Sequence, residues 1–257
     1  GLGVKALQVK LNQLGLGPLV EDGIFGQVTE SAVRIFQQSV GILSDGVVGP
    51  QTEGAMPLLG PLRQEHAPWW VGQLLLVLEA KGYSAHQDGQ CNIIGVRSSE
   101  SRANQFDDWI YLVWMVDGEW DYRTYPATTD PGIAWLEAPG QASGTAILCP
   151  GQYEVYKWDR HAGRYETLCQ REGTVRVYRD ANQDEVLDMD PESTAEGWFG
   201  INIHHAGEDS RSVDKWSAGC QVFKRLADWQ EAVRIWKDTR AELFTYTLIL
   251  EEDLPCV

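Results

Sequence analysis

Cys220 and His204 are the residues of this chain whose types and spacing favour covalent chemistry. A strand-like run, Gly200-Ile-Asn-Ile, ends at His204, and a small-residue turn, Ser217-Ala-Gly, precedes Cys220. A cysteine attacks a carbonyl as its thiolate, so it needs a nearby imidazole to take the proton. The small residues let the backbone turn sharply and direct N–H groups at the oxyanion that forms. The pattern predicts acyl transfer at Cys220.

Each of these residues taken alone has a plainer interpretation. A free cysteine is most often a buried, inert thiol, and a histidine at a strand end is often only hydrogen-bonded. His205 is predicted either to orient the base or to contact substrate. His161 lies in a segment rich in Tyr, Trp and Gly, and either borders the cleft or caps a turn.

A repeated turn motif marks the N-terminal part of the chain. D-G-x-x-G-x-x-T occurs at residues 22–29 and again at 45–52. The Asp-Gly pair suits a turn with positive φ, and the residues up to Thr supply helix caps. Apolar residues at helical spacing over 4–14 and 28–36 predict helices that share a core.

Residues 4–56 resemble the peptidoglycan-binding domain of many wall hydrolases, whose pattern runs LQxxLxxLG, DGxFGxxTxxAVxxFQ and DGxxGxxT. The resemblance implies a peptidoglycan partner, through its glycan strand and stem peptide. A generic three-helix bundle with good turns is the alternative.

The second half resembles the L,D-transpeptidase catalytic domain (YkuD type), in which a Gly-Ile-x-x-His strand end precedes a Ser-His-Gly-Cys turn. The resemblance implies Cys220 as nucleophile, His204 as general base and the His205 carbonyl as its orienter. It also implies an oxyanion hole of backbone N–H groups around Gly219 and Cys220. Residues 128–132 (TTDPG) loosely resemble that family's substrate-flanking turn.

The sequence departs from this pattern at two places. Ala218 stands where the family usually has a second histidine, and Gln221-Val222 replaces a pair ending in Arg or Asn. These changes favour hydrolysis slightly over cross-linking. The predicted catalytic residues are Cys220, His204, His205, Gly219 and Ser217. The predicted substrate contacts are Trp216, Gln221, His161, Asp22, Gly23 and Phe25.

The predicted function is a cysteine enzyme that acts on peptidoglycan stem peptides through a thioester, as an L,D-carboxypeptidase, endopeptidase or L,D-transpeptidase. Alternatives are a binding protein without catalysis, and a lysin or effector directed at foreign walls. Papain-like peptidases place Cys before His, whereas no histidine follows Cys220. A zinc amidase would need a third ligand beside His204 and His205, and the other histidines lie at no ligand spacing.

Composition excludes several partners. The formal net charge of −16 and the pI near 4.6 oppose binding to nucleic acid. The apolar run at 71–78 is too short to span a membrane. No cofactor and no metal is predicted. Calcium is left open at Asp180-Ala-Asn182-Gln-Asp184, because Glu185 and Pro191 replace the turn glycine and final Glu of a calcium loop.

The expected location is periplasmic, extracellular or cell-wall-associated, and a monomer is expected. The chain begins at Gly1 without a basic and apolar leader, so a signal peptide is expected to have been removed or never present. Five cysteines leave at least one unpaired, and the pairing of the others stays open.

The elements that must position these residues follow from periodicity and breakers. Prolines in 57–70 predict a linker, giving a peptidoglycan-binding domain at 1–60, a linker at 61–68 and a catalytic domain at 69–257. Helices are predicted at 69–81 and 226–237. Strands are predicted at 92–96, 109–116, 145–148, 153–158, 174–179, 200–204 and 243–250, the last closing the sheet. The fold class is α+β, with a small all-α three-helix domain preceding a β-rich L,D-transpeptidase-like domain.

Overall fold

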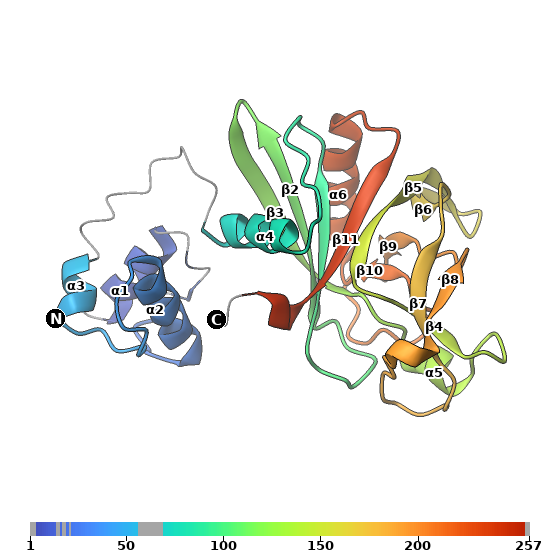
Figure 1. Ribbon diagram of the computed structural model, residues 1–257, viewed down its shortest axis with the longest axis horizontal. Coiled ribbons are helices and arrows are strands. Elements are labelled where there is room, and N and C mark those ends of the chain that lie inside the picture. The colour runs from blue at the N-terminus through green and yellow to red at the C-terminus, as the bar shows by residue number, and fades with distance from the viewer. Residues whose placement is uncertain (1–3, 14–15, 17–18, 21, 56–68, 255–257) are drawn as a thin grey trace. The chain divides into compact units, whose positions relative to one another are not determined.

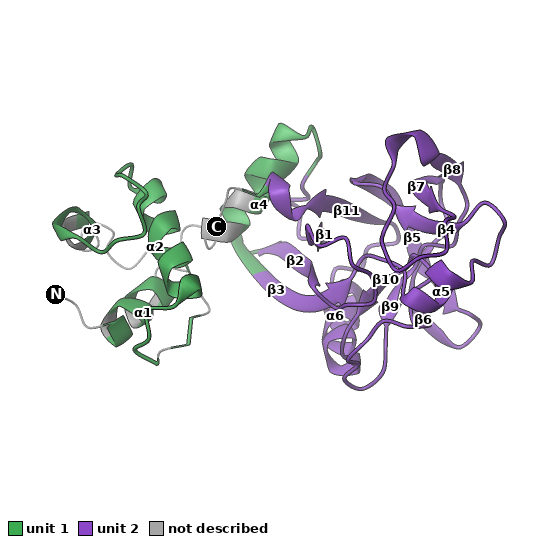
Figure 2. Ribbon diagram, turned by 90° about the horizontal axis from the view of Figure 1, so that it is seen from below, with its two compact units in different colours: residues 1–84, 116–121, 254–257 green, residues 85–115, 122–253 purple. Residues whose placement is uncertain are grey.

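The chain divides into two compact units in the computed structural model, which describes residues 4–13, 16, 19–20, 22–55 and 69–254. The first unit comprises the described residues up to Ser84, residues 116–121 and Leu254 (Figure 2). The second comprises residues 85–115 and 122–253. The predicted linker at 61–68 lies outside the described residues, and the predicted domain boundaries stay a prediction.

The first unit contains helices α1 (Val4–Gln13), α2 (Gln27–Ser39), α3 (Pro50–Ala55) and α4 (Trp69–Ala80) (Figure 1). Leu7 and Leu11 of α1 pack against Val33 and Phe36 of α2, and all four side chains are buried. Their spacing of three or four residues puts them on one face of each helix. The predicted three-helix domain within residues 1–60 stays a prediction.

The first Asp-Gly turn is organised by one buried glutamine, Gln8. Its Nε2 donates to Asp22 Oδ1 at 2.9 Å, to the Ile24 carbonyl at 3.1 Å and to Thr29 Oγ1 at 3.3 Å. Its Oε1 accepts from the Gly23 N–H at 2.8 Å. One side chain therefore satisfies backbone and side-chain groups that the turn leaves without helical partners.

The second Asp-Gly turn repeats this arrangement around Gln37. Its Nε2 donates to Asp45 Oδ1 at 2.7 Å, to the Val47 carbonyl at 2.9 Å and to Thr52 Oγ1 at 3.0 Å. Its Oε1 accepts from the Gly46 N–H at 2.8 Å. Each copy of the D-G-x-x-G-x-x-T motif is thus held by one glutamine from a preceding helix. The glutamine donates to the Asp and Thr side chains and accepts from the Gly N–H.

The second unit is built around a closed barrel with the strand order β1-β11-β5-β6-β9-β10-β3-β2. A separate three-stranded sheet has the order β4-β7-β8. The strands are β1 (Asn92–Arg97), β2 (Asp108–Val116), β3 (Glu119–Thr128), β4 (Thr145–Leu148), β5 (Gly151–His161), β6 (Tyr165–Gln170), β7 (Val175–Asp180), β8 (Ala195–Gly197), β9 (Ile203–His205), β10 (Gln221–Phe223) and β11 (Phe244–Leu250). The helices are α5 (Ile133–Glu137) and α6 (Leu226–Asp238), with short 3₁₀ turns at Pro191–Ser193 and Glu251–Asp253.

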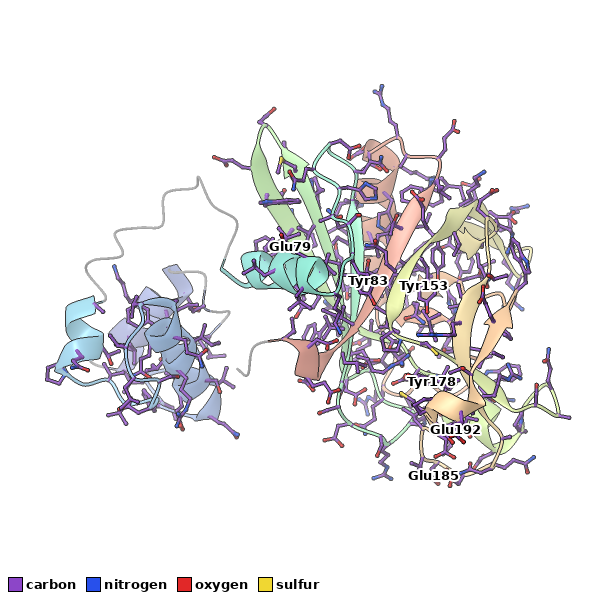
Figure 3. The ribbon with its side chains drawn as sticks, in the orientation of Figure 1. Glu79, Tyr83, Tyr153, Tyr178, Glu185 and Glu192 are labelled. Carbon is purple, nitrogen blue, oxygen red and sulfur yellow. The ribbon has the colours of Figure 1, made fainter. Side chains whose placement is uncertain are left out.

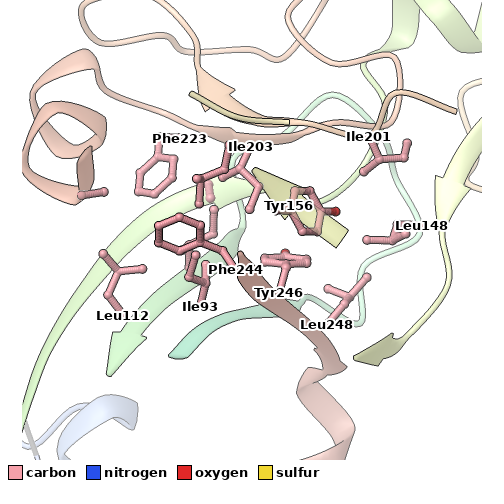
Figure 4. Close-up of a cluster of buried hydrophobic side chains, with 14 of the residues drawn as sticks. Ile93, Leu112, Leu148, Tyr156, Ile201, Ile203, Phe223, Phe244, Tyr246 and Leu248 are labelled. Atoms are coloured by element: carbon pink, nitrogen blue, oxygen red, sulfur yellow. The ribbon is translucent and has the colours of Figure 1, made fainter. Parts of the chain in front are cut away.

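The core of this unit consists of inward-facing strand residues and one face of α6. Ile203, Phe223 and Tyr246 are fully or almost fully buried inside it (Figure 4). Trp236 of α6 closes the cluster with an edge-on contact to Phe223, at a centroid distance of 6.0 Å. Because successive side chains of a strand point to opposite faces, the residues on either side of these three face away from the core.

The α+β class is confirmed, and several predicted elements match closely, including α4, α6, β1 and β11. The prediction of a strand over 200–204 was wrong for residues 200–202, because β9 begins at Ile203. The N–H groups of residues 199–201 all point at Gln170 Oε1, at 3.3, 2.9 and 3.2 Å, so they pair with no neighbouring strand. Strand β11 lies between β1 and β5 in the closed barrel.

Replacing Gln37 by alanine is expected to open the second turn. The change removes four hydrogen bonds and leaves the buried Gly46 N–H without its acceptor, which costs about 2 kcal/mol. Hydrogen exchange of the Gly46 amide in the full chain should be about thirtyfold faster. The matched control is Gln38→Ala, because Gln38 is exposed on the same helix. Equal exchange rates in the two variants would refute the role of Gln37.

Candidate active site

The turn that carries Cys220 is closed by the hydroxyl of Ser217. Ser217 Oγ accepts from the Gly219 N–H at 3.1 Å and donates to the Cys220 carbonyl at 2.8 Å. Ser217 is fully buried. Gly219 has φ +116°, and a Cβ there would lie 2.2 Å from the Ala146 carbonyl oxygen. Only glycine fits this position, so the turn has one backbone path.

Gln221 supports the same turn from inside the barrel. Its Oε1 accepts from Tyr246 Oη at 2.6 Å, and its Nε2 donates to the carbonyls of Gly219 at 3.2 Å and Thr129 at 3.4 Å. Gln221 has no exposed surface. The structure therefore places this predicted substrate contact behind the turn. The 128–132 segment lies against the turn as well, because the Gly132 N–H donates to the Ser217 carbonyl at 2.9 Å.

A buried charged network holds the 128–132 segment. Asp108 Oδ2 accepts from the N–H of Thr129 at 2.6 Å and from its hydroxyl at 2.8 Å. Arg97 Nε lies 2.8 Å from Asp130 Oδ1. Burial, followed by the charge of Asp130, raises the pKa of Asp108 to about 7. No sequence pattern predicts this network, because its members lie in separate strands and loops.

Strands β9 and β10 run parallel and bring His204 and Cys220 to one side of the sheet. Ile203 pairs with Gln221, and His204 pairs with Val222. Ile203 faces the core, so His204 faces the opposite side. The Cys220 thiol accepts from the Asn202 N–H at 3.4 Å and donates to the Gly200 carbonyl at 3.5 Å.

The His204 imidazole is oriented and almost fully buried. Its Nδ1–H donates to the His205 carbonyl at 3.0 Å, which leaves Nε2 as the lone-pair nitrogen. Nε2 is buried and has no hydrogen-bond partner among the described residues. Burial lowers the pKa of His204 to about 3 and raises the pKa of the Cys220 thiol to about 11. The resting pair is therefore a neutral imidazole and a neutral thiol.

The His205 side chain points away from Cys220. Its ring lies between Tyr165 and Trp229, at a centroid distance of 4.7 Å from each. Its Nδ1–H donates to the Ala206 carbonyl at 2.5 Å. The structure thus brings the backbone carbonyl of His205 to the His204 imidazole, whereas the His205 ring packs against Tyr165, which also lies 5.9 Å from the His161 ring.

Two further predicted contacts lie at the border of the site. His161 ends β5 and stacks on His204, with ring centroids 4.1 Å apart. Trp216 precedes the turn, and 44% of its surface is exposed. A partly exposed indole beside the Cys220 turn offers apolar contact area to a ligand.

The three predicted contacts of the N-terminal motif belong to the first unit. Asp22 Oδ1 accepts from Gln8 Nε2 and from the Ile24 N–H, and Gly23 adopts φ +79°. Both residues are therefore used to build the turn. The Phe25 side chain differs, because 41% of its surface is exposed.

Gln170 is a positioning residue that the sequence did not reveal. Besides gathering the three N–H groups of residues 199–201, its Nε2 donates to the carbonyls of Gly173 at 2.9 Å and Gly197 at 3.1 Å. This side chain sets the path of the chain into β9. No local pattern indicated this role, because β6, which ends at Gln170, was not predicted from the sequence.

The acidic loop at 180–188 is organised by an amide. Asn182 Nδ2 donates to Asp184 Oδ2 at 2.9 Å and to Asp188 Oδ2 at 2.7 Å. Figure 3 labels Glu185 on this loop. Within the described part of the chain, no group of three or more His, Cys, Asp or Glu side chains is arranged to hold a metal ion.

Cys91, Cys149, Cys169 and Cys220 are free and buried, and Cys256 lies outside the described residues. Among the helices described here, none is both long and apolar enough to cross a membrane.

Comparison with known proteins identifies the N-terminal stretch. Residues 1–56 match the family model described as "Putative peptidoglycan binding domain". This match covers both copies of the turn motif and supports association with the cell wall. No curated protein matches the chain.

Two solved structures are similar to the chain over most of its length. One is a fused Zn-dependent amidase/peptidase/peptidoglycan-binding domain-containing protein from Clostridium acetobutylicum ATCC 824, at 16% identity and a TM-score of 0.29, covering 97% of this chain and 96% of that one. The other is an L,D-transpeptidase from Xylanimonas cellulosilytica DSM 15894, at 21% identity and a TM-score of 0.27, covering 97% of this chain and 94% of that one.

Replacing Gly219 by alanine is expected to break the Cys220 turn. The new Cβ would overlap the Ala146 carbonyl at a backbone conformation that L-residues rarely adopt, so we expect a loss of about 3 kcal/mol in the free energy of unfolding. Urea denaturation of the full chain measures this loss. Gly140→Ala is the matched control, since nothing lies within 4 Å of its Cβ position. Equal stability of the two variants would contradict the geometry of the turn.

Proposed function

We propose that this protein is a wall-targeted cysteine acyltransferase of the L,D-transpeptidase type, which acts on peptidoglycan stem peptides. The observation that carries the proposal is the His204 imidazole, oriented by the His205 carbonyl, with a buried lone pair on the same side of β9 and β10 as Cys220. Thioester chemistry requires a cysteine and a base oriented to take its proton. The family match over residues 1–56 supplies the target.

In the proposed reaction the Cys220 sulfur attacks the carbonyl of the L-centre of the third stem residue. Its proton passes to His204 Nε2, and the peptide C–N bond to the following D-residue breaks. His204 returns the proton to the departing amine, which leaves a thioester on Cys220. Water then releases a shortened stem peptide, or the amine of a second stem forms a cross-link, and the thiol is regenerated in either case.

The depressed pKa of His204 and the raised pKa of Cys220 shape this step. A free thiolate–imidazolium pair is unfavourable in the resting site, so proton transfer accompanies the attack. The sulfur must also turn from the Gly200 carbonyl toward His204 when substrate binds. Catalytic hydrogen bonds commonly tighten only in the complex with substrate.

In the proposed site the oxyanion hole has fewer free N–H donors than the sequence predicts. The Gly219 N–H is already donated to Ser217 Oγ, so Gly219 serves the turn. In the proposed site the Cys220 N–H is the donor that remains from the predicted pair. Ser217 and Gln221 act as positioning residues, because each holds the turn without reaching its open side.

Wall binding is assigned to the first unit. Ile24, Phe25 and Val28 expose 67%, 41% and 69% of their surfaces beside the first Asp-Gly turn. Exposed apolar residues that gather on one turn are typical of a binding surface. Asp22 and Gly23 shape that surface through Gln8.

A non-catalytic peptidoglycan-binding protein is the second candidate. The observation that favours it is the thiol itself, which donates to Gly200, is almost fully buried and has a raised pKa. Such a cysteine resembles a structural thiol more than an activated one.

Digestion of purified muropeptides separates these candidates. The wild-type chain should release D-alanine or form new cross-links, as read by mass spectrometry, and Cys220→Ala should reduce both by at least about a thousandfold. Cys91→Ala is the matched control, since Cys91 is a buried free cysteine outside the turn. Products that survive in Cys220→Ala would sink the nucleophile assignment. No products from the wild type would favour the binding protein.

A further inference from the structure

His161 reaches the proposed site from a part of the chain that the motif does not include. It ends β5, whereas His204 lies in β9, and the two rings stack with centroids 4.1 Å apart and planes inclined by 24°. His161 is partly buried and covers one face of the His204 imidazole. Ala218 in the turn is exposed and carries no imidazole. The imidazole that contacts His204 comes instead from His161, at the end of β5.

Hydrogen bonds fix the tautomer of each ring. The backbone N–H of Gln170 donates to Asn202 Oδ1 at 3.1 Å, and a backbone N–H can only donate, so the orientation of the Asn202 amide is determined. Asn202 Nδ2 therefore donates to His161 Nδ1 at 3.1 Å. The proton of neutral His161 lies on Nε2, whereas that of His204 lies on Nδ1. The stacked rings thus carry opposite tautomers.

Several ionisable groups surround the stacked pair. Burial lowers the pKa of His161, with further contributions from nearby cations, so the ring is neutral at neutral pH. The surrounding groups are Tyr165 and Cys169 on β6, Arg164 before it, Arg171 after it, His205 on β9 and Cys220 before β10. Positive charge on Arg164 and Arg171 opposes a proton on the His161 imidazole.

We propose that His161 is a positioning residue of the acyl-transfer site, which fixes the His204 ring by stacking and excludes water from it. This inference rests on the proposed function. A stacked ring restricts rotation of His204, so Nε2 stays directed toward the side on which Cys220 lies. The same ring keeps His204 dry and therefore available as a neutral base.

The test compares two variants of the full chain. His161→Phe keeps a flat ring and loses both nitrogens, whereas His161→Ala removes the stack. The control is His86→Ala, a histidine of the same unit whose Nε2 lies 3.3 Å from Thr245 Oγ1. Histidine Cε1–H signals are followed by NMR over pH 3–8. The chain has five histidines, and the His204 signal is identified by its loss in His204→Gln.

In the wild type and in His86→Ala, His204 should not titrate above about pH 4. In His161→Ala water reaches the ring, so its pKa should rise by at least about one unit toward the ordinary value of about 6.5. In His161→Phe it should stay within about half a unit of the wild type. With muropeptide substrate, His161→Ala should lower kcat about tenfold with KM within about threefold, and His161→Phe should recover most of kcat.

Two results would overturn the inference. One is a His204 pKa that does not respond to His161→Ala, and the other is a His161→Phe variant as impaired as His161→Ala. The nitrogen spectra of the wild type provide a check that needs no variant, since an Nδ1–H tautomer at His161 contradicts the hydrogen bonding described. Failure of the proposed function is distinguishable, because it appears as products that survive in Cys220→Ala or as no products from the wild type, and neither outcome depends on the titration.

Discussion

The site depends on the parallel pairing of β9 with β10. This pairing sets Ile203 against Gln221 and His204 against Val222, so the residues that precede the two strands, Asn202 and Cys220, also lie side by side. A slip of one residue would turn His204 into the core and Ile203 toward the thiol. The closed barrel prevents such a slip, because each strand has neighbours on both sides. His204 and Cys220 are thus placed by a ladder that belongs to the closed barrel itself.

Buried carboxamides do the local work of shaping turns throughout the molecule. Gln8 and Gln37 each gather one Asp-Gly turn, Gln170 gathers three N–H groups before β9, and Gln221 supports the Cys220 turn. A carboxamide offers two donors and an acceptor without a charge, so it can be buried at low cost when every group is satisfied. Asn202 is another such carboxamide: it accepts from the Gln170 N–H and donates to His161 Nδ1. In the proposed mechanism such neutral contacts keep the site dry until substrate enters.

The sequence predicted those features that depend on short-range patterns. Periodicity located α4, α6 and β11, and the turn motif predicted the family match over residues 1–56. Spacing predicted that His204 and Cys220 belong together, but it could not predict which atoms are already engaged, such as the Gly219 N–H. Strand β10 was not predicted, because three residues carry too little periodicity, and its pairing partners lie far away in sequence. The contacts of Gln170 and Arg97 depend on tertiary structure, and no local pattern encodes them.

In the proposed reaction Cys220 carries the acyl group, and rapid-quench peptide mapping by mass spectrometry can detect that group on the residue that holds it. The wild-type chain is mixed with a tetrapeptide muropeptide, quenched in acid, digested and mapped. We expect an adduct on the Cys220 peptide that hydroxylamine removes, and the peptide should gain the mass of the muropeptide less one free D-alanine. An adduct on any other residue would contradict acylation of Cys220. So would release of D-alanine from the muropeptide at full rate by protein whose Cys220 is blocked by alkylation.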